Sequence, residues 1–136
     1  FAQNPEIRCP FCGGITDPSE IDHFLPKSRY GHFSVFPYNL IPICKDCNQK
    51  FKGNFFPTVK NEQFIHPYLD EDCFFDEQWL YAEYIDNGPG AGTVRYLIDP
   101  PNGWSSDKKG KIKFHFETFH LADRFSAYQS EVCLIF

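Results

Sequence analysis

Hydrophobic and polar residues alternate along the second half of the chain. Residues 79–85 and 93–99 show the period of two that is typical of β-strands, and the glycine-rich residues 87–92 between them predict a turn. Residues 112–116 alternate in the same way and predict a third strand. Apolar residues spaced four and three apart then predict a helix over residues 121–134. This half is expected to form an antiparallel layer followed by a helix.

The first half contains shorter apolar segments. Residues 20–25 and 40–43 are strand candidates, although the second contains a proline, which suits an edge strand better than a central one. Residues 46–52 predict the first turns of a helix that begins at Asp46 as its N-cap and stops at Gly53.

The composition is that of a packed domain. The 136 residues are enough for one core, and 42% of them are hydrophobic, with sixteen Phe. No apolar run approaches the roughly 20 residues that a membrane helix needs, so no membrane partner is expected. The sequence begins at Phe1 and contains no Met, so we expect it to be an excerpt of a longer protein.

The net charge of −5 is distributed unevenly along the chain. Residues 1–60 contain seven Lys or Arg and five Asp or Glu, whereas residues 61–136 contain six and thirteen. A weakly basic segment that is joined to an acidic one can still bind phosphate groups through a local patch. The charge therefore permits a nucleic-acid partner for the first segment without requiring one.

Four cysteines form two pairs with the spacing of zinc ligands. Two residues separate Cys9 from Cys12 and Cys44 from Cys47, and two such pairs fit a tetrahedral, structural Zn²⁺ site. Disulfides are the competing interpretation, which the lack of a recognisable secretory signal disfavours. The 31 residues between the pairs exceed the usual 15–20 of zinc ribbons, so chemistry is to be sought in this insert. Two further cysteines are expected to be small hydrophobic residues of the core: Cys73 and Cys133.

The insert carries residues in a specific order. The motif Asp-His-x-x-Pro-x-Ser begins at residue 22, and Asn-Leu-x-Pro-x-Cys-x-x-Cys-Asn begins at residue 39. In this order, residues 9–53 resemble the HNH endonuclease family in its zinc-knuckle form. The resemblance implies a ββα-metal (His-Me finger) fold, in which a two-stranded hairpin and a helix clasp one divalent ion.

The resemblance also implies roles for four residues. Asp22 and Asn48 match the metal ligands, His23 matches the general base, and Asn39 matches the residue that pins the hairpin loop. Many members of the family have His at the position of Asn48. The amide in this chain suggests an oxygen-liganded Mg²⁺ or Mn²⁺ as the catalytic ion and not a second zinc.

The residue types fit phosphodiester hydrolysis independently of the family. Neighbouring residues on a strand point to opposite sides, so Asp22 would reach the ion while His23 takes a proton from water on the other side. Asn48, in the first turn of a helix, would bring its carbonyl oxygen to the ion beside a helix N-terminus that favours phosphate. In the alternative interpretation, Asp22 is a solvated strand charge and His23 is a hydrogen-bonded core histidine.

Basic residues near the motif are candidates for contacts with a nucleic-acid backbone, which position the strand without reading its sequence. Each of them is about equally well explained as a solvated surface residue. His66, further along the chain, either packs beneath the site or touches a phosphate. The five candidates are Lys27, Arg29, Lys45, Lys50 and Lys52.

The sequence thus predicts an α+β fold and a nuclease function. We expect one domain over residues 1–136, with the zinc knuckle and ββα-metal core in 1–53, a connection in 54–77, and an antiparallel extension with a terminal helix in 78–136. The predicted function is a metal-dependent endonuclease that hydrolyses DNA, with RNA not excluded. The alternative is a catalytically inactive, zinc-stabilised nucleic-acid-binding module. The acidic half could dock a protein partner, such as a subunit of a bacterial defence system, and the expected location is the bacterial cytoplasm.

Overall fold

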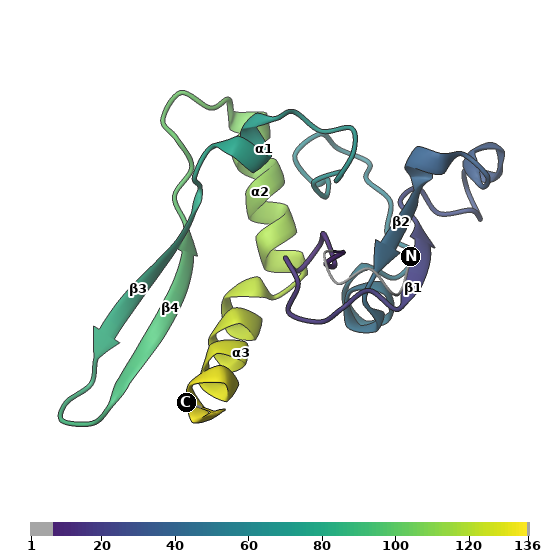
Figure 1. Ribbon diagram of the computed structural model, residues 1–136. Helices are drawn as coiled ribbons and strands as arrows, with labels where there is room; N and C mark the ends of the chain where they lie inside the picture. Colours follow the sequence, from purple (N-terminus) through teal and green to yellow (C-terminus); the bar gives the residue numbers. More distant parts are fainter. Residues whose placement is uncertain (1–6, 136) are drawn as a thin grey trace.

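The computed structural model describes residues 7–135, with side chains as far as Gln129. Two regions are visible in Figure 1: a small hairpin within residues 20–43 that is followed by a short helix, and a long hairpin within residues 80–98 that lies beside the two C-terminal helices. The mixture of small antiparallel sheets and helices confirms the predicted α+β class.

The first hairpin consists of β1 (Glu20–His23) and β2 (Leu40–Ile43), which pair antiparallel. The bounds of β2 are those predicted, whereas β1 ends two residues earlier than expected. The long loop between the strands contains two short 3-10 turns, η1 (Gly31–Phe33) and η2 (Pro37–Asn39). This loop carries the aromatic residues that surround the site described below.

A short helix, η3 (Asp46–Lys52), follows β2 and has the widened i→i+5 hydrogen bonding that is frequent at functional sites. Gly53 ends it with φ of 53°, a backbone conformation that favours glycine, as predicted. The prediction of Asp46 as N-cap is wrong. Lys45 precedes the helix with helical dihedral angles, and Asp46 instead forms an ion pair with Lys50 at 3.1 Å.

The second region begins with the short helix α1 (Cys73–Asp76). β3 (Leu80–Asp86) and β4 (Gly92–Ile98) then form the antiparallel hairpin that the alternating pattern predicted. Two helices complete the chain, α2 (Ser106–Thr118) and α3 (Leu121–Ile135), and both pack against β4.

The prediction of a third strand over residues 112–116 is wrong, because these residues lie within α2. The hydroxyl of Ser105 accepts a hydrogen bond from the backbone N–H of Lys108 at 3.3 Å and caps the start of the helix. Ile112, His115 and Phe116 are buried, on the three-and-four spacing of one helical face. A segment this short satisfies both periods, and the cap favours the helix.

The principal core joins the cysteines to the C-terminal helices. The rings of Phe11, Phe64 and Phe119 pack with centroids 4.8–6.3 Å apart. Each fully buried apolar side chain of this kind contributes roughly 1.5–3 kcal/mol. The buried His115 adds a polar link: its Nδ1 accepts from the N–H of Ile65 at 3.1 Å, and its Nε2 donates to the carbonyl of Phe11 at 2.9 Å. Because this core places α3 beside the cysteines, the C-terminal half supports the first half.

No helix within residues 7–135 combines the length and the apolar character needed to cross a membrane.

Candidate active site and metal centre

The four paired cysteines converge at one point. The sulfur atoms of Cys9, Cys12, Cys44 and Cys47 all lie within 4.8 Å of one another, and all four residues are fully buried. None of them forms a disulfide, and neither does Cys73, which is partly buried. The cluster fits a tetrahedral metal site of the kind that structural zinc occupies, as predicted. The side chain of the remaining cysteine, Cys133, lies outside the described residues.

The protonation of these thiols also fits a bound cation. The hydrogen bond with Cys12 raises the pKa of the Cys9 thiol to about 11, and hydrogen bonds with Cys12 and Cys9 raise the pKa of Cys47. The same contacts lower the pKa of Cys12, because its neighbours stabilise it as the thiolate. Sulfur atoms this close cannot all ionise unless a positive charge lies among them, which is what a divalent metal ion provides.

Arg124 of α3 brings a further positive charge to the cysteine cluster. Its Nη1 donates to the sulfur of Cys47 at 3.4 Å and to the carbonyl of Phe119 at 3.0 Å, and its guanidinium lies 4.5 Å from the ring centre of Phe51. The sequence offered no signal for this contact, because 77 residues separate Arg124 from Cys47 and only the packing of α3 joins them.

His23 and Asp22 lie on opposite faces of β1, as the strand geometry predicted. Asp22 faces η3, where it contacts Lys52, and His23 faces the loop, where its Nε2 lies 2.9 Å from the carbonyl oxygen of Ser34. A carbonyl can only accept, so Nε2 of the neutral ring carries the proton. The other ring nitrogen, Nδ1, is therefore the basic one, which suits a general base.

Asn39 pins the loop between β1 and β2. It is buried, its Oδ1 accepts from the N–H of Leu25 at 2.7 Å, and its Nδ2 donates to the carbonyls of Leu25 and Phe33, both at 3.2 Å. These three bonds connect the beginning and the end of the loop. Because Phe33 precedes Ser34, the same bonds help to hold the carbonyl that contacts His23.

Lys52 is not available to a phosphate, so the prediction that it contacts nucleic acid is wrong. Its side chain is only 1% exposed, and its ammonium lies 2.5 Å from Oδ2 of Asp22 and 2.9 Å from the carbonyl of His23. Lys52, the last residue of η3, thus joins this helix to β1 through both Asp22 and His23. The ammonium of Lys52 is therefore used in an ion pair with the carboxylate of Asp22 inside the protein.

Glu20 is a site residue that the sequence prediction missed. Its carboxylate accepts from the amide of Asn48 at 2.7 Å and from that of Gln49 at 2.7 Å. The signal was present, because a strand period of two places Glu20 on the same face as Asp22. With Nδ2 of Asn48 turned toward Glu20, the amide oxygen of Asn48 is the atom that can bind an ion.

The donors around η3 are chemically suited to a hard divalent ion. Glu20 and Asp22 share a face of β1, Asn48 of η3 donates to Glu20, and all three residues offer oxygen ligands. Mg²⁺ commonly binds one or two carboxylates and keeps several waters and substrate phosphate oxygens as its other ligands. The residues therefore fit such an ion, and Lys52 occupies one of the two carboxylate oxygens of Asp22.

The other predicted phosphate-contacting residues lie on the surface. Lys27, Arg29, Lys45 and Lys50 are exposed, with Lys50 paired to Asp46 and the Arg29 guanidinium 4.1 Å from the ring centre of Phe56. Long cationic side chains at exposed positions can reach a nucleic-acid backbone at little cost.

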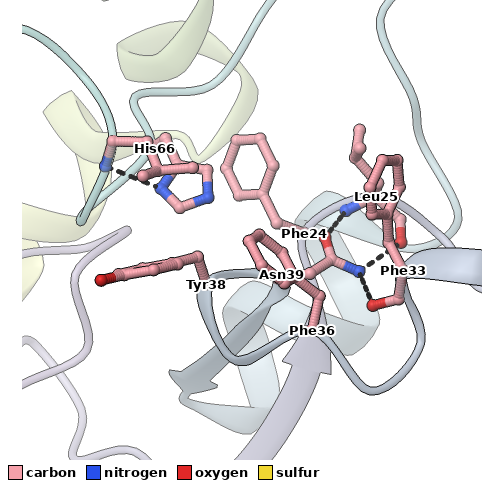
Figure 2. Close-up of a pocket in the computed structure, with 8 residues that line it drawn as sticks. Phe24, Leu25, Phe33, Phe36, Tyr38, Asn39 and His66 are labelled. Carbon is pink, nitrogen blue, oxygen red and sulfur yellow. Dashed lines mark hydrogen bonds between the residues drawn. The ribbon is translucent and has the colours of Figure 1, made fainter.

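His66 packs in the structure, which decides between the two interpretations left open by the sequence. Its ring centroid lies 4.3 Å from that of Phe24, and its Nδ1 accepts from the N–H groups of Tyr68 and Leu69 at 3.1 and 3.2 Å. Burial lowers the pKa of His66, so the ring is neutral near neutral pH. Figure 2 shows it at one side of a pocket that Asn39 and the loop aromatics complete.

A β-hairpin and a helix that are joined through a four-cysteine cluster define a zinc-knuckle ββα unit. Residues 7–53 match the model of the HNH endonuclease family. The match of this segment to the family model confirms the resemblance drawn from the motif.

Two curated relatives extend the similarity beyond this segment. The chain is 43% identical over 118 residues to Protein ea31 of Escherichia phage lambda, covering 87% of this chain and 39% of that protein. It is 39% identical over 94 residues to the Septu protein PtuB of Bacillus thuringiensis, covering 66% of this chain and 35% of that protein. The chain spans less than two fifths of the length of either relative. No solved structure matches it.

Proposed function

We propose that the chain is a metal-dependent endonuclease that hydrolyses DNA phosphodiester bonds. The observation that carries this proposal is the placement of His23 and Asp22 on opposite faces of one strand, with the imidazole held in a single tautomer by the carbonyl of Ser34. The HNH family match supports the reaction class.

In this proposal, Nδ1 of His23 takes a proton from the attacking water. The resulting imidazolium strengthens the hydrogen bond from Nε2 to the carbonyl of Ser34, because a charged donor forms the stronger bond. Asn39 holds the loop and so keeps the ring at a fixed angle. The base therefore remains oriented during proton transfer without rearranging the loop.

Asp22 and Asn48 are the proposed ligands of a catalytic Mg²⁺ or Mn²⁺. When bound, such an ion supplies positive charge to the scissile phosphate and to the leaving oxygen. Glu20 orients the amide of Asn48, and Lys52 fixes the carboxylate of Asp22. The cysteine cluster is proposed to hold a structural Zn²⁺, with Arg124 as a positive charge beside the thiolates.

The exposed basic residues around the site are proposed to contact the nucleic-acid backbone: Lys27, Arg29, Lys45 and Lys50. A bacterial cytoplasmic setting, a role in defence and a protein partner on the acidic C-terminal half stay predictions of the sequence. The assignment of residues 1–136 to a single domain also stays a prediction. RNA is not excluded as a substrate.

One observation favours the alternative of a binding module that does not cleave. Lys52 already neutralises Asp22, and a carboxylate committed to a lysine is a weaker metal ligand. In that alternative, the chain binds nucleic acid in a salt-dependent manner and never cuts it.

Supercoiled-plasmid nicking separates the two functions. We expect the wild type to nick with Mg²⁺ or Mn²⁺ and not with EDTA, and we expect His23→Ala to lose nicking while its zinc content is unchanged. The matched control is His120→Asn, which changes an exposed histidine whose ring contacts Phe51 and keeps a residue type that tolerates its φ of 51°. A folded, zinc-loaded wild type that binds DNA without cutting it would favour the binding module.

A further inference from the structure

An aromatic pocket is built on the loop between β1 and β2 (Figure 2). Its volume is about 240 Å³. Since sites for drug-sized molecules begin at roughly 300 Å³, this pocket suits one ring system better than a longer ligand. Its lining residues come from the β1–β2 loop and from the segment around His66; they are Phe24, Leu25, Phe33, Phe36, Tyr38, Asn39, His66 and Leu69.

The lining is unusual because its aromatic rings are open to solvent. Phe36 is 45% exposed and Tyr38 is 50% exposed, and their ring centroids lie 5.6 Å apart. Leu69 is 60% exposed. Exposed apolar residues that gather in this way usually mark a binding surface.

The polar side chains of Asn39 and His66 in the pocket are already committed to the protein. Asn39 uses both its oxygen and its nitrogen in bonds to the loop backbone. Nδ1 of His66 accepts two backbone N–H groups, and a hydrogen bond with the backbone of Tyr38 engages the ring further. The pocket therefore offers its ligand ring faces and little directional hydrogen bonding, which selects a flat, aromatic group.

The pocket is connected to the proposed catalytic residues through one of the residues that line it, Phe33. Phe33, which lines it, precedes Ser34, whose carbonyl binds His23. Asn39 fastens Phe33 to Leu25, so the wall and the carbonyl are positioned together. A ligand in the pocket would therefore contact the same loop segment that orients His23.

A second apolar hollow continues the surface past Tyr38. It has a volume of about 360 Å³ and lies on the outer face of the β1–β2 hairpin. Ile21, which lines it, is on the same face of β1 as His23, because side chains at positions i and i+2 of a strand share a face. Tyr38 lines both hollows, and the apolar surface therefore flanks His23.

Exposed cations at the same loop complete the pattern. Lys27 and Arg29 lie in the loop between β1 and β2 and are exposed. Aromatic rings that alternate with cations are the arrangement by which proteins bind single strands, since bases stack on the rings and phosphates meet the cations. Bases within an intact duplex stack on each other and cannot enter such a pocket.

We propose that the aromatic pocket binds an unpaired nucleobase adjacent to the scissile phosphate, so that the chain prefers single-stranded or locally unpaired nucleic acid. This inference rests on the proposed nuclease function for the position of the phosphate. Stacking carries the recognition, so little dependence on base identity is expected.

The test compares binding of a fluorescein-labelled single-stranded oligothymidylate with binding of a duplex of equal length, by anisotropy in EDTA. Phe36→Leu combined with Tyr38→Leu keeps apolar bulk and removes two rings. We expect about 5- to 100-fold weaker binding of the single strand, since stacking of one base on an aromatic ring accounts for about that factor. Duplex binding should not change. Phe36→Tyr, which keeps a ring, should bind as the wild type does.

The control is Phe75→Leu, the same exchange at a Phe that is 55% exposed on α1. A single-stranded probe that carries 2-aminopurine adds a direct readout, because stacking on a protein ring quenches its fluorescence. Equal affinity for single strand and duplex, or equal behaviour of the pocket variant and Phe75→Leu, overturns the proposal.

The outcomes for the pocket and for the nuclease are separable. Binding in EDTA needs no cleavage, and His23→Ala should still bind the single strand. If binding depends on the pocket but no cutting is seen, the nuclease proposal is contradicted and the pocket proposal is supported. If the pocket variant cuts single strands with metal as fast as the wild type does, the pocket proposal is contradicted and the nuclease proposal is supported.

Discussion

The ammonium of Lys52 and the carboxylate of Asp22 form a buried ion pair at the centre of the candidate site. The two groups lie 2.5 Å apart, and the lysine side chain is 1% exposed while that of Asp22 is 20% exposed. Lys52 also donates to the carbonyl of His23. One side chain therefore holds the carboxylate of Asp22 and the backbone of the proposed base.

Replacing Asp22 should destabilise the fold as well as remove catalysis. Asp22→Asn leaves the ammonium of Lys52 buried without a counter-charge, and breaking such a pair costs roughly 3–5 kcal/mol. Asp22→Asn combined with Lys52→Met should recover part of that loss, because the buried charge is gone. Urea denaturation of the two single variants and the double variant measures the coupling energy.

The surface pair of Asp46 and Lys50 is the matched control. Its side chains are 42% and 69% exposed, and Asp46→Asn with Lys50→Met should shift stability by less than about 0.5 kcal/mol. If the stability changes of the single variants add up in the double variant at both pairs, Lys52 and Asp22 are not energetically coupled.

Local signals were enough to predict the elements around the site. The bounds of β2, the stop at Gly53 and the separation of Asp22 from His23 all follow from short-range pattern and strand geometry. The cysteine spacing predicted a cluster that the structure assembles. These features depend on residues that are close in sequence, or on a spacing that one ion dictates.

What could not be predicted depends on packing between distant segments. The burial of Lys52 follows from how η3 rests on β1, and Arg124 reaches Cys47 only because α3 packs against the knuckle. The helix over residues 112–116 resembled a strand because five residues satisfy both periods. In that case the cap at Ser105 was the overlooked local signal.

The cysteine cluster should bind one zinc ion per chain, and the chain should lose its fold when the ion is removed. Cys12→Ser takes away a ligand, and the buried thiols that remain then lack the charge that allows them to ionise. We expect loss of stoichiometric zinc and of near-ultraviolet circular dichroism, measured by metal analysis and spectroscopy. Cys73→Ser changes a cysteine outside the cluster and should keep both. Zinc loss in both variants, or in neither, contradicts the assignment.

Arg124 should slow the release of metal from the knuckle. Arg124→Met keeps the stem and removes the hydrogen bond to Cys47, and such a bond to a charged group contributes about 1.5–3 kcal/mol. Transfer of zinc to a chromogenic chelator should become about 10- to 150-fold faster, since each 1.4 kcal/mol corresponds to a factor of ten. Arg95→Met is the control, because Arg95 pairs only with Glu83 among the described ion pairs, on the exposed β3–β4 hairpin. Identical transfer rates for the two variants would leave Arg124 with a packing role alone.

The free energy of unfolding should decrease as the pH falls, because His115 is buried in its neutral form. Burial lowers the pKa of this histidine from 6.5 to about 4, because the ring is enclosed between Ile65 and Phe11 and both its nitrogens are used by a neutral tautomer. The unfolded chain takes up the proton below pH 6.5 and the folded chain does not. Stability is therefore complete above pH 6.5 and declines toward pH 4, by about 3 kcal/mol at most. Urea denaturation in zinc-saturated buffer at several pH values from 7 to 5 gives the slope. His115→Gln, which cannot titrate, should be less stable at pH 7 but lack this component. An unchanged slope in His115→Gln would assign the pH dependence to other groups.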